Sequence, residues 1–327
     1  MHDELISVIV PAYNCAQWLP GTLDSLLTQT YPNLEIIVVN DGSKDETAEI
    51  IDRYTRMDSR IRGIHQENGG VTAARLRGVR EAVGEWIGFA DGDDILEPDM
   101  LRHLMENAMK YGADISHCGF SVHHPDNSVE YMHGTGALKV QSHVTGLQDL
   151  LAEALVEPSL CTKLFRRRLF RGLEEKMPRE LKNNEDMLMN YYLFEQADTS
   201  VFEDICLYRY LLHPGSASRR KLNDHLIYDP IRVRQIILDH CEPDMREDAR
   251  RALARMCLVS YRQLVVEPGR EYRGDLKKVR SLIRQQLPYA DMLPGRNRLL
   301  VHLISGAPWM FDCMFRVYAC LTGKGKE

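Results

Sequence analysis

"LISVIVPAYN", residues 5–14, is a nearly continuous run of apolar and β-branched residues that ends in a proline and two polar side chains. A run with so little polar alternation is typical of a strand buried on both faces, as in a parallel sheet. Three similar runs follow: "LEIIVVN" (34–40), "IRGIH" (61–65) and "WIGFA" (86–90). Segments with helical spacing separate them. The pattern predicts an α/β fold with a mostly parallel, Rossmann-like sheet and helices on both faces.

Local signals predict where several of these helices begin and end. Ser43 and Glu46 fit a capping box that opens a helix after the second strand. Gly84 is expected to end the helix that follows the third strand. Pro98 suits the first turn of the next helix, and Gly112 is expected to end it.

The rest of the chain differs in composition. Residues 121–145 are polar and are expected to form a loop region, and residues 146–220 mix helix and strand signals. From about residue 224 the pattern is helical with basic faces. We therefore expect three parts: 1–120, 121–220 and a helical extension, 221–327. From residue 211 onward there are 21 Lys and Arg against 13 Asp and Glu, whereas the first 210 residues hold 20 against 34. The basic part suits either an anionic surface or a solvated helical face.

Cysteine usage and the N-terminus bear on the cellular compartment. The eight cysteines among 327 residues form no C-x-x-C pair and show no regular spacing. This favours reduced thiols in a cytoplasmic protein over a disulfide framework or a zinc site. The opening "MHDEL" is acidic, so no signal peptide is expected.

Polar, turn-forming residues follow each of the four predicted strands: "PAYN", "NDGS", "ENGG" and "DGDD". In an open α/β sheet, ligands bind beyond the carboxyl ends of the strands. Asp91, Asp93 and Asp94 repel one another unless a positive charge lies among them, and two carboxylates can point at one Mg²⁺ or Mn²⁺. An acidic, solvated turn is the alternative reading.

Other residues suit a nucleotide site at the same edge. Tyr13 offers an aromatic face for stacking, and Asn14 can hydrogen-bond a base edge. Asp41 can accept hydrogen bonds from a ribose or base, although Asp-Gly also simply makes a turn. Asp186, in "NNED" (183–186), can cap a helix or serve as a general base.

Taken together, six motifs resemble the family 2 glycosyltransferases with a GT-A fold. They are "ISVIVPAYNCAQWL", "VNDGSKDET", "QENGGVTAAR", "FADGDDILEPDML", "CTKLFRR" and "NNEDMLM", in this order between residues 5 and 218. The resemblance implies a metal-dependent hexosyltransferase or N-acetylhexosaminyltransferase. Such an enzyme moves a sugar, with inversion, from a nucleoside diphosphate, usually UDP, to a hydroxyl of a saccharide or lipid-linked saccharide. It also implies Mn²⁺ or Mg²⁺ as cofactor.

The resemblance assigns roles by position. It gives the nucleoside pocket to Pro11, Ala12, Tyr13 and Asn14, the uracil or ribose contact to Asp41, the ribose and metal to Asp91, the metal to Asp93, and the catalytic base to Asp186. It gives the diphosphate side to Arg75 and Lys163, and the segment closing over the diphosphate to His213 and Ser216. Asp94 is either a supporting acid or the start of the next helix, and Glu185 is a further candidate beside Asp186. Leu76 departs from the family pattern, which commonly has asparagine there.

Three other functions are alternatives to glycosyl transfer. A dinucleotide-dependent oxidoreductase needs G-x-G-x-x-G after the first strand, and "VPAYNCAQW" lacks it. An Asp-dependent phosphohydrolase would turn over a generic phosphate ester. A non-catalytic protein that binds sugar nucleotides or glycans would not need both Asp93 and Asp186. The substitution Asp186→Asn separates this last reading from an enzyme.

The C-terminal residues 299–321 are apolar-rich but interrupted by His302, Asp312 and Arg316, and Pro308 breaks the helical pattern. The segment is therefore a poor membrane span. An interfacial helix on anionic lipid, a helix pair packed on the protein and a homodimer contact stay open as alternatives. We expect a cytoplasmic protein with no nucleic-acid partner, and peripheral contact with the inner face of the cell membrane is one hypothesis.

Overall fold

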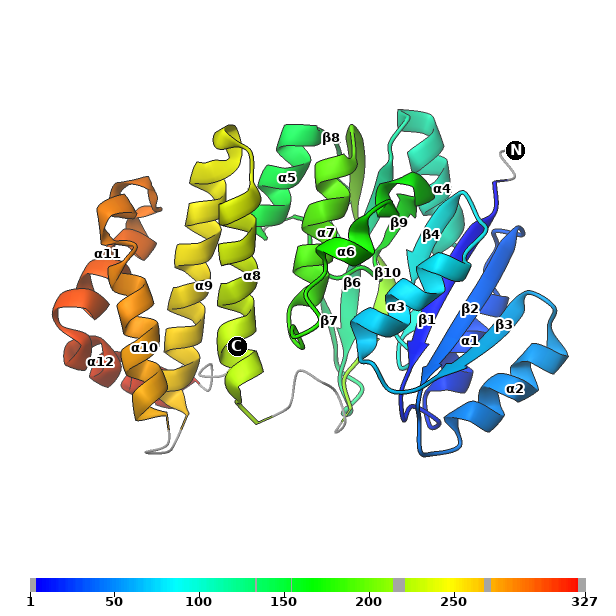
Figure 1. Cartoon of the computed structure of the whole chain (residues 1–327), viewed down its shortest axis with the longest axis horizontal. Coiled ribbons are helices and arrows are strands. Elements are labelled where there is room, and N and C mark those ends of the chain that lie inside the picture. The colour runs from blue at the N-terminus through cyan, green and yellow to red at the C-terminus, as the bar shows by residue number, and fades with distance from the viewer. Residues whose placement is uncertain (1–3, 133, 154, 214–220, 268–271, 323–327) are drawn as a thin grey trace. The chain divides into compact units, whose positions relative to one another are not determined.

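The structure is a computed structural model that describes residues 4–132, 134–153, 155–213, 221–267 and 272–322 (Figure 1). The chain divides into two compact units. The first comprises Met1–Glu180 and Glu185–Arg220, and the second comprises Leu181–Asn184 and Lys221–Glu327.

The first unit is built on one sheet of order β3-β2-β1-β4-β9-β6-β10-β5, in which β7 also pairs with β6 and β8 with β10. The strands are β1 (Ile6–Ala12), β2 (Leu34–Asp41), β3 (Ile61–Gln66), β4 (Trp86–Phe89), β5 (Ile95–Leu96), β6 (Ile115–His123), β7 (Val129–Tyr131), β8 (Leu138–Ser142), β9 (Lys163–Arg166) and β10 (Thr199–Leu211). Strands β3, β2, β1 and β4 run parallel. Beyond β4 the sheet is mixed, because β9 is antiparallel to both β4 and β6.

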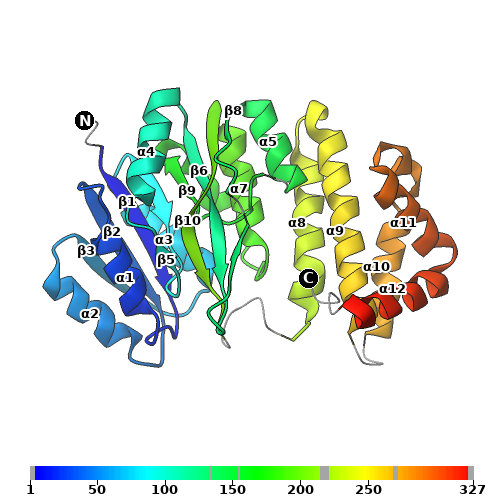
Figure 2. The ribbon, with the colours of Figure 1, turned by 180° about the vertical axis from the view of Figure 1, so that it is seen from behind.

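Helices cover both faces of this sheet. They are α1 (Leu19–Leu27), α2 (Thr47–Met57), α3 (Val71–Glu81), α4 (Met100–Tyr111), α5 (His143–Ala152), α6 (Leu173–Lys176) and α7 (Glu185–Gln196). Helices α3 and α7 lie on the face seen in Figure 1, and α1 and α4 lie on the opposite face, seen in Figure 2. Strands β1 and β2 are almost wholly buried between these layers, as their continuous apolar sequences predict.

The predicted α/β architecture is confirmed, and the local signals have mixed outcomes. Helix α4 ends at Gly112, which has the left-handed conformation that its sequence position predicts. The capping box was wrong, because α2 begins at Thr47 and the Ser43 hydroxyl instead accepts a hydrogen bond from the Asn14 backbone N–H, at 3.0 Å. Gly84 was also wrong as a helix end, because α3 stops at Glu81. At Gly84 a Cβ would lie 2.6 Å from the Leu5 carbonyl oxygen, so close backbone approach explains this glycine.

The polar stretch 121–145 is not simply a loop. It contains the end of β6 together with β7 and β8, whose side chains are mostly exposed. Strands with no buried face need no apolar alternation, so the sequence carried no signal for them.

The second unit is helical, as predicted from residue 224 onward. It contains α8 (Asp224–His240), α9 (Arg246–Val266), α10 (Arg273–Arg284), α11 (Gly295–Gly306) and α12 (Pro308–Thr322). Its core includes Ile237 of α8, Leu264 of α9 and Ile283 of α10. The break that Pro308 predicts separates α11 from α12. Within the parts of the chain described above, no helix combines the length and apolar character that a membrane crossing requires.

Candidate active site

The three aspartates of the acidic turn after β4 differ in burial: one is buried and two are partly exposed. Asp94 is 1% exposed, and its carboxylate accepts hydrogen bonds from the Tyr208 hydroxyl at 2.8 Å and the Leu211 backbone N–H at 2.9 Å. The Tyr208 oxygen in turn accepts from the Asp91 N–H, at 3.2 Å. Burial, followed by the charges of Asp91 and Asp93, raises the pKa of Asp94 well above its usual range. Asp94 therefore fixes the turn to β10, while Asp91 and Asp93 stay partly open to solvent.

Asp93 is paired with an imidazole from the end of the first unit. The His213 Nε2 atom lies 2.9 Å from Asp93 Oδ2, and the His213 ring stacks on Trp18 with ring centroids 3.8 Å apart. Burial raises the pKa of Asp93, and the His213 hydrogen bond opposes this shift. No three acidic, histidine or cysteine side chains of the described residues cluster closely enough to hold a metal ion by themselves. Asp93 and His213 thus form a two-residue donor set at the carboxyl ends of the strands.

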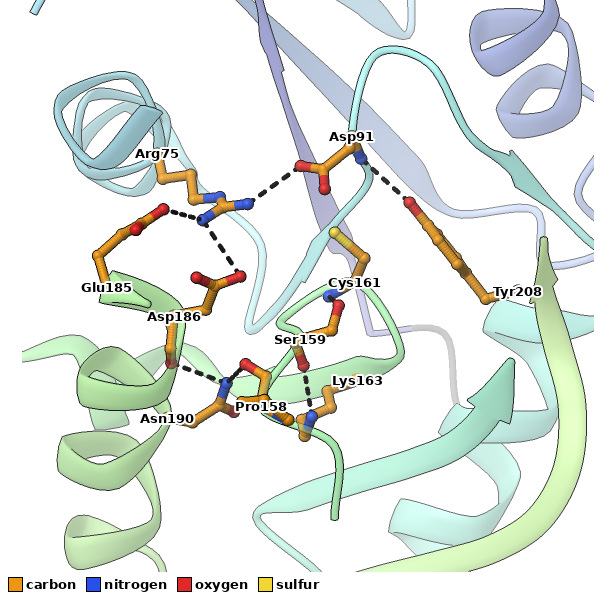
Figure 3. Close-up of polar contacts among 10 residues, drawn as sticks. All are labelled: Arg75, Asp91, Pro158, Ser159, Cys161, Lys163, Glu185, Asp186, Asn190 and Tyr208. Carbon is orange, nitrogen blue, oxygen red and sulfur yellow. Dashed lines mark hydrogen bonds and ion pairs between the residues drawn. The ribbon is translucent and has the colours of Figure 1, made fainter. Parts of the chain in front are cut away.

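Arg75 of α3 connects the acidic turn to the start of α7 (Figure 3). Its guanidinium lies 3.0 Å from Asp91 through Nη2, and 3.6 Å from Glu185 and 3.8 Å from Asp186 through Nη1. The side chain is only 4% exposed, and its buried Nε and Nη1 atoms have no hydrogen-bond partner among the described residues. Burial lowers the pKa of Arg75, but Asp91 and Asp186 more than offset this and raise it overall. One buried cation therefore serves three carboxylates that are distant in sequence.

The two acids at the start of α7 have different environments. Glu185 is buried, and desolvation together with the charge of Asp186 raises the pKa of Glu185 to about 7, against the opposing effect of Arg75. The Asp186 side chain is 31% exposed. Of the two carboxylates, Asp186 is the one that is substantially open to solvent.

The segment just before this pair, Leu181–Asn184, belongs to the second unit. The Lys182 backbone N–H donates to Asp229 Oδ2 at 3.0 Å, and Arg234 donates to the Asn184 side-chain oxygen. Both partners are buried residues of α8. Asn184 has a φ of 64°, a left-handed conformation that asparagine tolerates. The position of the polypeptide one residue before Glu185 therefore depends on α8.

Lys163 is buried, and its ammonium group donates to the carbonyl oxygens of Glu157 (2.6 Å) and Ser159. Desolvation lowers the pKa of Lys163 to about 8. Asn190 of α7 ties the same loop down by donating to the Pro158 carbonyl at 2.6 Å. In this structure Lys163 therefore supports the loop 157–161, on the side of the site that Figure 3 shows beside Asp186.

Hydrogen bonds join the loop after β1 to the loop after β2. Tyr13, in the first of these loops, is exposed to solvent. The Asn14 side-chain oxygen accepts from the Lys44 N–H at 2.8 Å. Asp41 is buried and accepts hydrogen bonds from the Gln66 side chain and from the N–H groups of Gly69 and Gly70, at 2.8 to 2.9 Å. Asp41 therefore braces the turn between β3 and α3, the helix that carries Arg75.

The predicted residues thus fall into groups. Asp91, Arg75, Glu185 and Asp186 meet in one cluster, and Asp93 pairs with His213. Pro11 and Ala12 form the end of β1 beneath Tyr13. Ser216 lies outside the described residues. Sequence reasoning missed Tyr208, Trp18 and Asn190, since a tyrosine in a strand or an asparagine within a helix gives no signal of a partner more than 30 residues away.

The fold is an open α/β sheet with an acidic cluster at the carboxyl ends of its strands, and comparisons with known proteins identify its family. The profile of "Glycosyl transferase family 2" matches residues 7–173, half of the chain. This chain belongs to glycosyltransferase family 2.

Two curated relatives and one solved structure illustrate the similarity. The chain is 35% identical to glycosyltransferase GlyA of Streptococcus pneumoniae over 66% of its own length and 32% of GlyA. It is 34% identical to the uncharacterized glycosyltransferase EpsJ of Bacillus subtilis, over 68% of its own length and 66% of EpsJ. The chain thus spans less than two thirds of either relative. The structure of S. aureus TarS 1-349 in complex with UDP-GlcNAc has a TM-score of 0.74 at 20% identity and covers 98% of this chain and 92% of that one, a likeness of fold.

Proposed function

We propose that this protein is an inverting glycosyltransferase that uses a UDP-sugar donor and a hydroxyl of a saccharide or lipid-linked saccharide as acceptor. The observation that carries the proposal is the convergence of Asp91, Glu185 and Asp186 on the buried Arg75 guanidinium. It joins an acidic turn suited to a sugar nucleotide with a partly exposed carboxylate suited to proton transfer. Family membership and the UDP-GlcNAc complex of TarS support a UDP-linked hexose or N-acetylhexosamine as donor.

In this proposal Asp186 is the general base. It accepts the proton of the acceptor hydroxyl as that oxygen attacks the anomeric carbon, in a single displacement that inverts its configuration. Arg75 keeps the Asp186 carboxylate oriented through their 3.8 Å ion pair. Glu185 is too buried to reach the acceptor and serves as a neighbouring acid that also binds Arg75.

The donor occupies the N-terminal half, 1–120, in this proposal, and the acceptor lies toward 121–220. The exposed Tyr13 ring stacks on the uracil, with Pro11, Ala12 and Asn14 shaping the pocket. Asp41 acts through the turn at 66–70 that it already holds, and Lys163 through the loop 157–161. The diphosphate would lie at the acidic turn of Asp91 and Asp93 only together with a cation that offsets their shared negative charge.

The residues present fit a divalent cation. Asp93 and His213, whose Oδ2 and Nε2 atoms lie 2.9 Å apart, would supply one carboxylate and one imidazole to Mn²⁺, and Mg²⁺ also binds such acids together with substrate phosphates. Asp91, on the same turn, would be a further acid near the metal and the ribose. When bound, the cation offsets the negative charge that builds up on the departing diphosphate. Asp94 and Tyr208 hold the turn on which both carboxylates sit.

The first experiment is a donor screen. UDP release is measured from a panel of UDP-sugars, with simple saccharides as acceptors, in Mn²⁺ or Mg²⁺. The Asp186→Asn variant is expected to lose transfer by about 10³-fold while still binding UDP in a calorimeter. Asp198→Asn is the matched control, because Asp198 is a highly exposed aspartate two residues after the end of α7. Unchanged transfer by Asp186→Asn would remove Asp186 as the base, and robust hydrolysis of a generic phosphate ester would favour a phosphohydrolase instead.

The location follows as a further part of the proposal. We place the enzyme on the cytoplasmic side, in peripheral contact with the membrane that would present a lipid-linked acceptor. Fractionation of cells that express the tagged chain tests this, since a peripheral protein leaves the membrane fraction at high salt without detergent.

A further inference from the structure

Helix α12 packs on its own unit through one narrow stripe. Phe311 is buried, and Asp312, Phe315 and Ala319, at spacings of about four residues, are half-buried. The Phe311 ring lies 5.9 Å from the Tyr261 ring of α9, and the Tyr261 hydroxyl donates to Asp312 at 2.9 Å. These contacts fix which side of α12 faces inward.

The outward side of α12 is largely apolar. Trp309 is 69% exposed and Leu321 is 81% exposed, and the exposed apolar residues are Trp309, Met310, Cys313, Met314, Val317, Tyr318, Cys320 and Leu321. Arg316 and Thr322 are the other exposed residues of this helix. At 100° per residue, the eight apolar side chains cover half of the helix circumference, and none is charged. We call them the outer face of α12. A contiguous apolar surface of this kind on a water-soluble fold marks a binding surface.

The helices around this face are positively charged. Residues 272–322 hold eight Lys and Arg against three Asp, a net charge of +5. All three acids are already partnered: Asp275 by the Tyr228 hydroxyl, Asp312 by Tyr261 and Asp291 by Arg298. Arg316 lies at the border of the outer face, because it is seven residues, nearly two turns, beyond Trp309.

The exposed apolar face and the surrounding positive charge favour an anionic lipid surface over a second copy of the chain as the partner of α12. A second copy of the chain would bring the same net positive charge to the interface, and like charges disfavour that contact. An anionic lipid surface complements the charge, and Trp309 and Tyr318 are residues that favour the membrane interface. A helix of 15 residues is about 22 Å long, which suits lying in the interface.

We propose that the outer face of α12 inserts into the headgroup region of an anionic lipid bilayer, and that the basic residues of α10–α12 contact the lipid phosphates. The outer face of α12 belongs to the helical unit, so lipid binding can be measured without enzymatic turnover. The result therefore does not depend on whether the proposed glycosyl transfer is correct.

The test is co-sedimentation of the full chain with vesicles of phosphatidylcholine alone or with about one third phosphatidylglycerol. Binding is expected to the anionic vesicles, with at least a tenfold loss at 0.5 M salt or without the anionic lipid. The double variant Val317→Glu/Leu321→Glu is expected to bind at least tenfold more weakly. Both side chains are exposed, so the fold should be retained, and a thermal melt checks this.

The matched control is Met57→Glu/Val83→Glu, which adds the same charge at two exposed apolar positions of the first unit. It is expected to bind vesicles within a factor of two of the unchanged protein. An equal loss in this control, or no binding of the unchanged chain at low salt, would overturn the proposal. So would equally strong binding to neutral vesicles. A dimer that becomes a monomer in the Val317→Glu/Leu321→Glu variant, measured by light scattering, would assign the face to a second copy and overturn the proposal as well.

Discussion

The acidic site of the first unit and helix α12 of the second unit depart from ordinary protein surfaces in opposite ways. The site buries charge: Arg75, Asp94 and Glu185 are almost inaccessible to water. Helix α12 exposes apolar side chains that water disfavours. Each departure costs folding free energy unless something offsets it. In the site the compensating groups are other residues of the protein, whereas nothing within the described chain covers the outer face of α12. The site therefore needs no external partner for its stability, and the missing compensation on α12 is the basis for proposing one there.

The strongest test of this contrast is to remove the buried cation. Arg75→Met leaves Asp91, Glu185 and Asp186 without their shared guanidinium. We expect kcat/KM for UDP-sugar to fall by at least about 10³-fold. The free energy of unfolding should fall by about 3 to 5 kcal/mol, because the buried Glu185 and the partly exposed Asp91 and Asp186 lose their shared counter-charge. Arg77→Met is the control, since Arg77 is a half-exposed residue of α3 that pairs with Glu81. Near-normal activity of Arg75→Met would show that the cluster is not the active centre.

The next largest effect concerns the imidazole beside Asp93. His213→Ala should raise the Mn²⁺ concentration for half-maximal activity by about 10- to 100-fold, because a ligand or its orienting partner is lost. His103→Ala serves as the control, since His103 of α4 also pairs with a carboxylate, that of Glu203 on β10. The measurement is activity against free Mn²⁺ after chelator treatment. Equal metal responses in the two variants would exclude His213 from the metal site.

A third test uses pH. Glu185 has a pKa of about 7 in the folded protein against 4.5 for a free glutamate, so the folded state binds the proton more tightly. The contribution of Glu185 to the free energy of unfolding is therefore fully present below about pH 4.5 and is lost as pH rises through 7. A salt-bridged carboxylate has the opposite pH dependence, because it stabilises the fold at higher pH. Glu185→Gln should therefore reduce the loss of stability between pH 5 and 8 by about 1 to 3 kcal/mol. Denaturant unfolding across this range checks it, with the exposed Glu175→Gln as control. Parallel pH curves for Glu185→Gln and the unchanged protein would contradict the assignment.

The smallest expected effect is on the outer face of α12. Leu321→Ser should change the free energy of unfolding by less than about 0.5 kcal/mol, because Leu321 contacts mainly water. Ile283→Ala, in the core of the same unit, should cost about 2 to 5 kcal/mol. Chemical denaturation without lipid compares the two. A large loss in Leu321→Ser would mean that α12 is part of the folded core and would weaken the contrast with the site.

The sequence predicts much of the first unit because its signals are local. Strands β1 to β4 and the polar turns that follow them come from continuous apolar runs and turn residues that need no distant partner. Strands β7 and β8 could not be predicted, since they pair by backbone hydrogen bonds with largely exposed side chains. The capping box at Ser43 and Glu46 failed for a related reason: the Ser43 hydroxyl bonds to Asn14, on a different loop.

The sequence by itself determined that acids, an aromatic and small turn residues gather at one edge of a parallel sheet, because parallel strands bring their carboxyl ends to the same side. Only the tertiary structure decided what each acid does. Asp91 and Asp94 are three residues apart, yet Tyr208 from β10 buries one of them, and Arg75 from α3 pairs with the other. Whether a carboxylate is structural or available depends on its burial and its partners. The burial and the partners are set by residues up to 120 positions away, which the local sequence does not reveal.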